Sequence, residues 1–346
     1  MRGDGDKDQD GAVTDPSWNP AVLPDLSGRT AVVTGANSGL GFHTAAGLAR
    51  AGAQVVLTAR DGAKGDEALH RLKSQVPGAD ARVAVLDLAD LASVRAFARD
   101  LPGDRLDLLV NNAGVMATPR RTTADGFELQ LGTNHLGHFA LTGLLLPRLL
   151  TGSMPTGSMA TGSEPTGSTA DGPARVVTVS SGLHRRGRLN REDLMLERGY
   201  TPFGAYAQSK LANLLFALEL QRLVDAAAAP LASLAAHPGF AATNLQTAGP
   251  RMMGSRVREK INVLMSAVLA QPAEHGAWPT LRAATDPAAS GGEYFGPNGR
   301  GEMRGAPVRV GMSEQAADAD AARWLWNRSQ ELTGVRYDAL HAPPAA

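Results

Sequence analysis

Short apolar runs alternate with longer stretches of helical periodicity along most of the chain. The apolar runs consist largely of Val, Leu and Ala and are bounded by turn-forming residues, which is typical of strands. Strands are predicted at Thr30–Thr34, Val55–Thr58, Arg82–Leu86, Leu106–Val110, Arg175–Val179, Leu231–Ala235 and Glu293–Phe295. Helices are predicted at Leu40–Arg50, Ala63–Gln75, Leu91–Asp100, Asp125–Leu150, Tyr206–Asp225, Pro272–Ala284 and Ser313–Thr333.

This order predicts an α/β fold with a doubly wound (Rossmann), mostly parallel sheet and helices on both faces. Because the strands lack polar–apolar alternation, both faces of the sheet should be buried. No Pro-rich or charged linker divides the pattern, so residues 28–341 are expected to form a single domain. In such folds ligands bind at the carboxyl ends of the strands.

Two segments lie outside this alternation. Residues 1–27 carry Gly, Asp and Pro without apolar periodicity, which predicts a mostly disordered tail. Residues 151–173 include the successive units TGSMP, TGSMA, TGSEP and TGSTA, which predict a flexible low-complexity loop without core contacts. We therefore expect that replacement of residues 152–170 by a short turn leaves melting and turnover nearly unchanged.

The composition narrows the classes of function. Of 346 residues, 43% are hydrophobic, and Lys plus Arg equals Asp plus Glu at 34 each, so nothing favours nucleic acid or an anionic membrane surface. The chain has no cysteine, which excludes disulfides, thiolate metal sites and a cysteine nucleophile. No apolar run predicts a membrane span. The acidic N-terminus does not resemble a secretory signal, so a cytoplasmic protein is expected.

A glycine-rich turn follows the first predicted strand, at Thr34-Gly-Ala-Asn-Ser-Gly-Leu-Gly41. A turn of this kind lets a pyrophosphate approach backbone N–H groups at a helix N-terminus. Gly35, Gly39 and Gly41 serve the turn, the approach of the phosphate and the packing of the helix. The side chains of Asn37 and Ser38 can add hydrogen-bond donors. The candidate cofactor residues here are Gly35, Asn37, Ser38, Gly39, Leu40 and Gly41.

The end of the second strand bears on the choice of dinucleotide. NAD-specific sites place an acid there, on the ribose 2′-hydroxyl. This chain has Arg60, which can pair with a 2′-phosphate and stack on adenine, followed by Asp61, which leaves room for NAD. An ordinary exposed arginine is the alternative.

The third and fourth strands end in further candidates. Asp87 and Leu88 follow the third strand, where a carboxylate is well placed for an adenine amino group. Asn111-Asn112-Ala113-Gly114 follows the fourth strand and can bring backbone close to a cofactor, or serve as a structural turn that ties two strands together. Both roles can hold at once.

The sequence Tyr206-Ala-Gln-Ser-Lys210 places a phenol and an ammonium one helical turn apart on one face. A free tyrosine, with a pKa of about 10, is a poor acid at neutral pH. A neighbouring cation is expected to lower that pKa, which makes the tyrosine a usable proton donor and acceptor. A dinucleotide site combined with a proton-transfer group indicates hydride chemistry.

These segments together resemble the short-chain dehydrogenase/reductase superfamily, which pairs T-G-x-x-x-G-x-G with N-N-A-G and Y-x-x-x-K. The similarity covers roughly residues 27–335 and is greatest to retinol dehydrogenases and WW-domain-containing oxidoreductases. The features of that branch are Thr133-Asn-His-Leu-Gly-His-Phe139, Val179-Ser-Ser181, Ala207–Asn213, His237-Pro-Gly239 and Leu325–Ser329.

The resemblance implies roles for individual residues. Tyr206 would transfer the proton, Lys210 would hold the nicotinamide ribose and lower the tyrosine pKa, and Asn134 would position a water that relays protons. Ser181 would donate to the substrate oxygen, with Ser180 as the alternative, although 24 residues separate Ser181 from Tyr206 where many members have fewer. The nicotinamide would be lined by Pro238, Gly239 and Thr243.

The predicted function is an NADP(H)-preferring oxidoreductase, with NAD(H) possible, that interconverts a carbonyl and an alcohol on a mostly apolar small molecule. A homo-oligomer is possible. The alternatives are reduction of an activated C=C bond and a catalytically silent nucleotide-binding protein. An apolar cover over residues 244–269 is expected to form the substrate pocket, with Arg185 and Arg186 as a rival site for acidic substrates. His135 and His138 are interpreted as packing residues and not as metal ligands.

Overall fold

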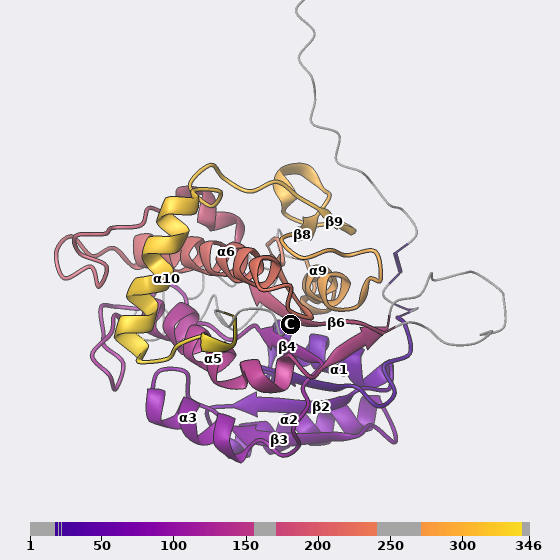
Figure 1. Ribbon diagram of the computed structural model, residues 1–346. Coiled ribbons are helices and arrows are strands. Elements are labelled where there is room, and N and C mark those ends of the chain that lie inside the picture. Colours follow the sequence, from indigo (N-terminus) through magenta and orange to yellow (C-terminus); the bar gives the residue numbers. More distant parts are fainter. Residues whose placement is uncertain (1–17, 20, 22, 156–170, 241–270, 341–346) are drawn as a thin grey trace, which may run out of the picture.

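The computed structural model describes residues 18–19, 21, 23–155, 171–240 and 271–340. Its central sheet has the order β3-β2-β1-β4-β6-β7-β8-β9, and β1 to β4 and β6 to β8 pair in parallel (Figure 1). The parallel strands are β1 (Thr30–Val33), β2 (Gln54–Ala59), β3 (Ala81–Val85), β4 (Leu108–Asn111), β6 (Asp171–Val179), β7 (Leu231–Ala236) and β8 (Tyr294–Pro297). The expected doubly wound, mostly parallel sheet is confirmed.

Successive residues of each strand face opposite layers of helices. Ala31 and Val33 of β1 belong to one apolar cluster, whereas Val32 between them belongs to the other. The first layer holds α1 (Gly39–Arg50), α2 (Gly62–Gln75) and α9 (Ala273–Thr285). The second holds α3 (Leu91–Asp100), α5 (Gly137–Leu149), α6 (Pro202–Ala226) and α10 (Ala319–Thr333), with α10 against α6 (Figure 1).

Three helices begin at residues other than those predicted from the apolar periodicity, and in each case a capping residue precedes the observed start. The helix expected from Asp125 begins at Leu129, because the Glu128 carboxylate accepts from the N–H groups of Gln130 and Leu131 at 2.9 and 2.7 Å. This helix comprises α4 (Leu129–Leu131), a π-turn η1 (Gly132–Leu136) and α5. The helix expected from Ser313 begins at Ala319, after the cap Asp318. Similarly, α6 begins at Pro202, one turn before Tyr206.

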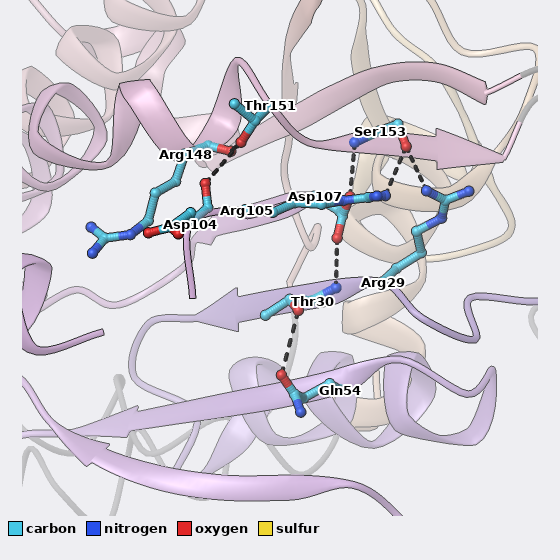
Figure 2. Close-up of polar contacts among 9 residues, drawn as sticks. All are labelled: Arg29, Thr30, Gln54, Asp104, Arg105, Asp107, Arg148, Thr151 and Ser153. Carbon is cyan, nitrogen blue, oxygen red and sulfur yellow. Dashed lines mark hydrogen bonds and ion pairs between the residues drawn. The ribbon is translucent and has the colours of Figure 1, made fainter. Parts of the chain in front are cut away.

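A buried carboxylate joins the amino ends of several strands (Figure 2). Asp107 is fully buried and accepts from the backbone N–H of Thr30 at 2.7 Å and of Ser153 at 2.8 Å. It also pairs with Arg105 Nε at 2.6 Å. Arg105 and Arg29 both donate to the Ser153 hydroxyl. This polar cluster lies at the edge of the sheet opposite the carboxyl ends of the strands.

The expected loop over 151–173 differs from the structure at both ends. Ser153–Pro155 form β5, which pairs antiparallel with the start of β6. The other antiparallel pair of the described sheet is β9 (Pro307–Arg309) with β8. Gly152 has no room for a side chain, since a Cβ would lie 1.9 Å from the Leu106 carbonyl oxygen. Met154 is buried in the core. The first repeat unit is therefore part of the sheet, and residues 156–170 lie outside the described residues.

The tail expected over residues 1–27 also differs at its end. Trp18 and Leu26 are buried in the apolar cluster around α1 and α9. Residues 1–17 lie outside the described residues, so the expectation for them is not tested.

Excision of residues 156–170 should preserve the fold, whereas the excision expected from sequence, 152–170, should not. Pro155 and Asp171 are register partners, so an Asn-Gly pair in place of residues 156–170 closes the β5–β6 hairpin with a favoured two-residue turn. We expect thermal melting and turnover close to those of the full chain. Removal of 152–170 deletes the buried Met154, which should cost about 2–5 kcal/mol of unfolding free energy. Equal melting curves for the two deletions would contradict this.

Candidate active site

The glycine-rich turn approaches the fourth strand so closely that two of its glycines cannot be replaced. Gly35 has φ +63°, and a Cβ there would lie 2.9 Å from the Ala113 Cβ. A Cβ on Gly41 would lie 2.5 Å from both the Gly35 carbonyl oxygen and Asn112 Nδ2. The turn thus packs directly against the segment after β4.

The start of α1 presents free backbone donors to the same place. Ser38 is the N-cap, but among the described residues its side chain accepts no N–H group of the first turn. Such a helix N-terminus favours an anion both through its donors and through the helix dipole. The turn and this helix end fit the pyrophosphate of a dinucleotide.

A single hydroxyl holds the Asn111–Gly114 segment against the turn. Thr34 Oγ1 accepts from the N–H groups of Asn112 and Ala113 at 2.8 and 2.9 Å. Asn112 Nδ2 donates back to the Thr34 carbonyl at 2.7 Å. The segment therefore ties β1 to β4 and also lines the cleft.

A cleft of about 340 Å³ runs along the carboxyl ends of these strands. Most of the residues predicted to bind cofactor line it: Gly35, Asn37, Ser38, Gly39, Leu40, Gly41, Arg60, Asp87, Leu88, Asn112, Ala113, Gly114, Tyr206, Lys210 and Pro238. The cleft-lining residues that sequence reasoning did not single out are Thr58, Lys64, Leu86, Val115, Thr133 and Val179. They occupy strand ends and helix starts beside the motifs, a position that could have identified them.

Three of the predicted residues that the structure describes do not line the cleft, and a fourth cannot be placed. Ser181 bonds with Tyr206 and Asn134 bonds with Val115, and both of these partners line the cleft. Gly239 follows Pro238 at φ +65°, packed on the Met303 carbonyl. Thr243 and the expected substrate cover at 244–269 lie outside the described residues.

Two cations and one carboxylate form the end of the cleft beyond β2. Arg60 is exposed and lines the cleft together with Lys64 of α2. The carboxylate of Asp61 caps α2 by accepting from the Lys64 N–H at 3.3 Å, and it lies 3.8 Å from Lys64 Nζ. With two cations and one carboxylate, this end carries a net positive charge that suits a phosphate.

Tyr206 and Lys210 are both buried at the inner end of the cleft. Lys210 Nζ lies 5.7 Å from the centre of the Tyr206 ring and donates to the Val179 carbonyl at 2.9 Å. Burial raises the pKa of Tyr206 to about 12, although a hydrogen bond with Ser181 opposes the shift. Burial lowers the pKa of Lys210 to about 8. The expected lowering of the Tyr206 pKa is wrong for this structure, because loss of hydration outweighs a charge at this distance.

The two candidate serines have different partners. Ser180 is buried, and its hydroxyl donates to the Lys210 carbonyl at 2.8 Å. Ser181 is partly exposed, bonds with Tyr206, and caps a 3₁₀ turn, η2 (Gly182–Arg186), by accepting from the Leu183 N–H at 3.2 Å. Only Ser181 shares a hydrogen bond with the tyrosine, which favours it over Ser180.

Asn134 lies in the π-turn η1 and is held on three sides. Its amide accepts from the Val115 N–H at 2.8 Å and donates to the Val115 carbonyl and the Ser209 hydroxyl, both at 2.9 Å. A Cβ on Gly114 would lie 3.0 Å from Asn134 Oδ1 and 3.7 Å from Lys210 Nζ. The backbone at Gly114 therefore passes between Asn134 and Lys210. Isolated π-turns in helices are frequent at functional sites.

The histidines of this helix pack in the core, as expected. His138 lies between the Asn134 carbonyl and the Thr34 hydroxyl, each at 2.9 Å. The carbonyl can only accept, so Nδ1 carries the proton and Nε2 accepts from Thr34. Burial lowers the pKa of His138 to about 4, so the ring stays neutral. His135 bonds Ser329 and packs against aromatic rings.

Neither a metal cluster nor a membrane-crossing helix occurs in the described part of the chain. No group of three or more His, Asp or Glu side chains there could hold a metal ion. Likewise, none of its helices is both long and apolar enough to traverse a bilayer. Of the two arginines of the rival site for acidic substrates, Arg185 pairs with Glu302 at 2.9 Å and donates to the Gly311 carbonyl, and Arg186 is exposed.

Comparisons with known sequences agree with this geometry. The family model described as short chain dehydrogenase matches residues 29–163. Polyprenol dehydrogenase of Mus musculus is 43% identical over 323 residues, which cover 92% of this chain and 88% of that protein. Retinol dehydrogenase 14 of Mus musculus is 38% identical over 325 residues, which cover 90% and 87%.

Solved structures give the same picture. An uncharacterised protein from Mycobacterium paratuberculosis matches with a TM-score of 0.72 and 42% identity, covering 92% of this chain and 98% of the other. RhlG of Pseudomonas aeruginosa, solved with NADP in its active site, matches with a TM-score of 0.56 and 25% identity, covering 78% and 94%.

Proposed function

The chain belongs to the short-chain dehydrogenase/reductase superfamily, in its retinol dehydrogenase-like branch, and we propose that it interconverts a carbonyl and an alcohol on a mostly apolar small molecule with NADP(H) as the preferred cofactor. That it is an NAD(P)-dependent oxidoreductase follows from its dehydrogenase relatives. The observation that carries the proposal is the buried Tyr206–Lys210 pair, with Ser181 bonded to the tyrosine, at the inner end of the dinucleotide cleft.

The proton chemistry would be performed by this chain's own residues. A bound nicotinamide would supply or accept the hydride. Tyr206 would donate its proton to the developing alkoxide in reduction and take the alcohol proton in oxidation. Ser181 would hold the substrate oxygen beside that phenol. Lys210, charged below its pKa of about 8, would stabilise negative charge on the Tyr206 oxygen as the proton leaves.

Replacement of Arg60 tests the cofactor preference. The cation pair formed by Arg60 and Lys64 supports recognition of a 2′-phosphate, which NADPH has and NADH lacks. We expect Arg60→Ala to raise the Kd for NADPH by about tenfold, the loss of one charge-assisted hydrogen bond. The Kd for NADH should change little, as measured by fluorescence titration. Lys73→Ala is the control, because Lys73 is an exposed cation of the same helix, α2. Arg71 is unsuitable, because its guanidinium donates to the Asn37 carbonyl in the glycine-rich turn. Equal losses for both cofactors would count against the preference.

A panel of carbonyls and alcohols tests the reaction itself. With NADPH we expect oxidation of the cofactor by aldehydes or ketones, and a specificity constant that rises with chain length until the pocket fills. Enones belong in the panel, because product analysis separates C=O from C=C reduction. Absence of turnover with any compound and either cofactor would favour a silent nucleotide-binding protein. A preference for short oxo-acids would contradict the apolar pocket.

A further inference from the structure

Glu302 connects two segments that flank the inner end of the cleft. One of its carboxylate oxygens lies 2.9 Å from Arg185 Nη2, and the other lies 3.0 Å from His237 Nε2. Arg185 belongs to η2, the turn capped by Ser181. His237 directly follows β7 and precedes Pro238, which lines the cleft. Glu302 therefore bridges the serine side of the site and its opposite wall.

The His237 ring links Glu302 to the backbone of the Pro238–Gly239 segment. Its Nδ1 accepts from the Gly239 N–H at 3.2 Å, so the proton of the neutral ring resides on Nε2, which faces Glu302. The ring is buried and packs closely on Gly296, where a Cβ would lie 2.0 Å from Nε2. Glu302 and Gly239 therefore contact the two nitrogens of the same buried ring.

The backbone around Glu302 reinforces the same connection. The Met303 carbonyl accepts from the Phe240 N–H at 2.7 Å. Glu302 itself has φ +54°, a left-handed conformation that is unfavourable for a residue other than glycine. Unfavourable conformations of this kind persist where surrounding contacts fix them, frequently at functional sites. The charges are also balanced: although burial raises the pKa of the Glu302 carboxyl, His237 and Arg185 together lower it below its ordinary value.

We propose that Glu302 is a positioning residue, which holds the Ser181 segment and the Pro238–Gly239 segment at the separation that hydride and proton transfer require. The inference rests on the proposed function. It assigns Glu302 no contact with the reacting atoms, and its effect passes through Arg185 and His237. Loss of the bridge should therefore reduce the rate of chemistry more than the binding of cofactor.

The test compares Glu302→Ala with a matched control, Glu293→Ala. Glu293 is exposed to a similar degree, 23% against 27%, and pairs with Arg309 in the same β8–β9 region; among the described residues its carboxylate also accepts from the Ser290 N–H and Arg309 donates to the Ala288 carbonyl, neither of which lines the cleft. We expect Glu302→Ala to lower kcat about ten- to a hundredfold, because small displacements of reacting groups have effects of that size. The KM for NADPH should change less than about twofold. The control should keep both values, and both variants should melt at similar temperatures.

Further variants separate the bridge from a general loss of stability. Glu302→Gln retains one acceptor oxygen, and Arg185→Met breaks one side of the bridge, so both should give intermediate kcat values. Combining Arg185→Met with Glu302→Ala should lower kcat no further than Glu302→Ala alone. If Glu302→Ala does not fold, the kcat values of Glu302→Gln and Arg185→Met are compared with that of Glu293→Ala instead. A kcat for the Glu302 variants equal to that of Glu293→Ala, in an active wild type, would overturn the inference alone. An inactive wild type would overturn the proposed function, and the inference with it.

Discussion

Tyr206→Phe should lose turnover by at least about a hundredfold, the scale of general acid–base groups. The phenol would supply the proton that the substrate oxygen gains in reduction, and phenylalanine has none to give. The side chain keeps its volume, so the cleft should retain its shape and the Kd for NADPH its value. Steady-state rates and a fluorescence titration of the same preparation check both parts. Near-normal turnover would refute the assignment.

Tyr337→Phe provides the matched control for this variant. Tyr337 is also fully buried, but its hydroxyl donates to the Phe139 carbonyl at 2.7 Å, among α5, α6 and α10 and away from the cleft. Loss of this hydroxyl should lower the unfolding free energy by about 1 kcal/mol and leave kcat unchanged. The two tyrosines should therefore separate catalysis from stability.

Lys210→Met should lose turnover by about a hundredfold or more and yet stabilise the folded protein near neutral pH. Burial lowers the Lys210 pKa from 10.5 to about 8, so the folded state binds this proton less tightly than the unfolded chain does. Wild-type stability should therefore rise as pH increases from about 8 to 10.5. Below about pH 8, Lys210 is charged while buried, and this lowers the unfolding free energy by about 3 kcal/mol for a pKa shift of this size.

Methionine avoids that cost without leaving an unpaired acceptor. The Val179 carbonyl that accepts from Lys210 also accepts from Asn213 Nδ2 at 3.0 Å, so it stays satisfied in the variant. Urea unfolding should show the variant more stable than wild type below pH 8, with the difference shrinking towards pH 10.5. Lys73→Met makes the same substitution at an exposed position and is the matched control. A variant less stable than wild type at pH 7 would contradict the account.

Much of the fold could be predicted from sequence because its elements are locally encoded. Every predicted strand has a counterpart, since buried parallel strands produce uninterrupted apolar runs. The cleft residues follow from strand ends, where the glycine turn and the Asn111–Gly114 segment carry recognisable chemistry. The preference for Ser181 over Ser180 needed coordinates, because both hydroxyls follow the same strand and only their partners differ.

The remaining differences arise from contacts between distant residues. The β5 strand has no apolar pattern of its own and exists because Asp107, Arg29 and Arg105 bind Ser153 from far along the chain. Glu302 carries no motif, because its partners follow two other strands. The direction of the Tyr206 pKa shift depends on burial, which spacing from Lys210 does not reveal.

The first repeat unit forms strand β5, and this position has a consequence for how the number of repeat units can vary. Each later unit carries the same Thr-Gly-Ser, and after loss of the first unit Thr156-Gly-Ser-Met159 would bring the same four residue types to the sheet. Because every unit has the same number of residues, the gain or loss of one whole unit keeps the reading frame. A change in copy number should therefore leave a unit in place beside Asp107, and length should drift here in steps of one unit while the strands on either side keep theirs.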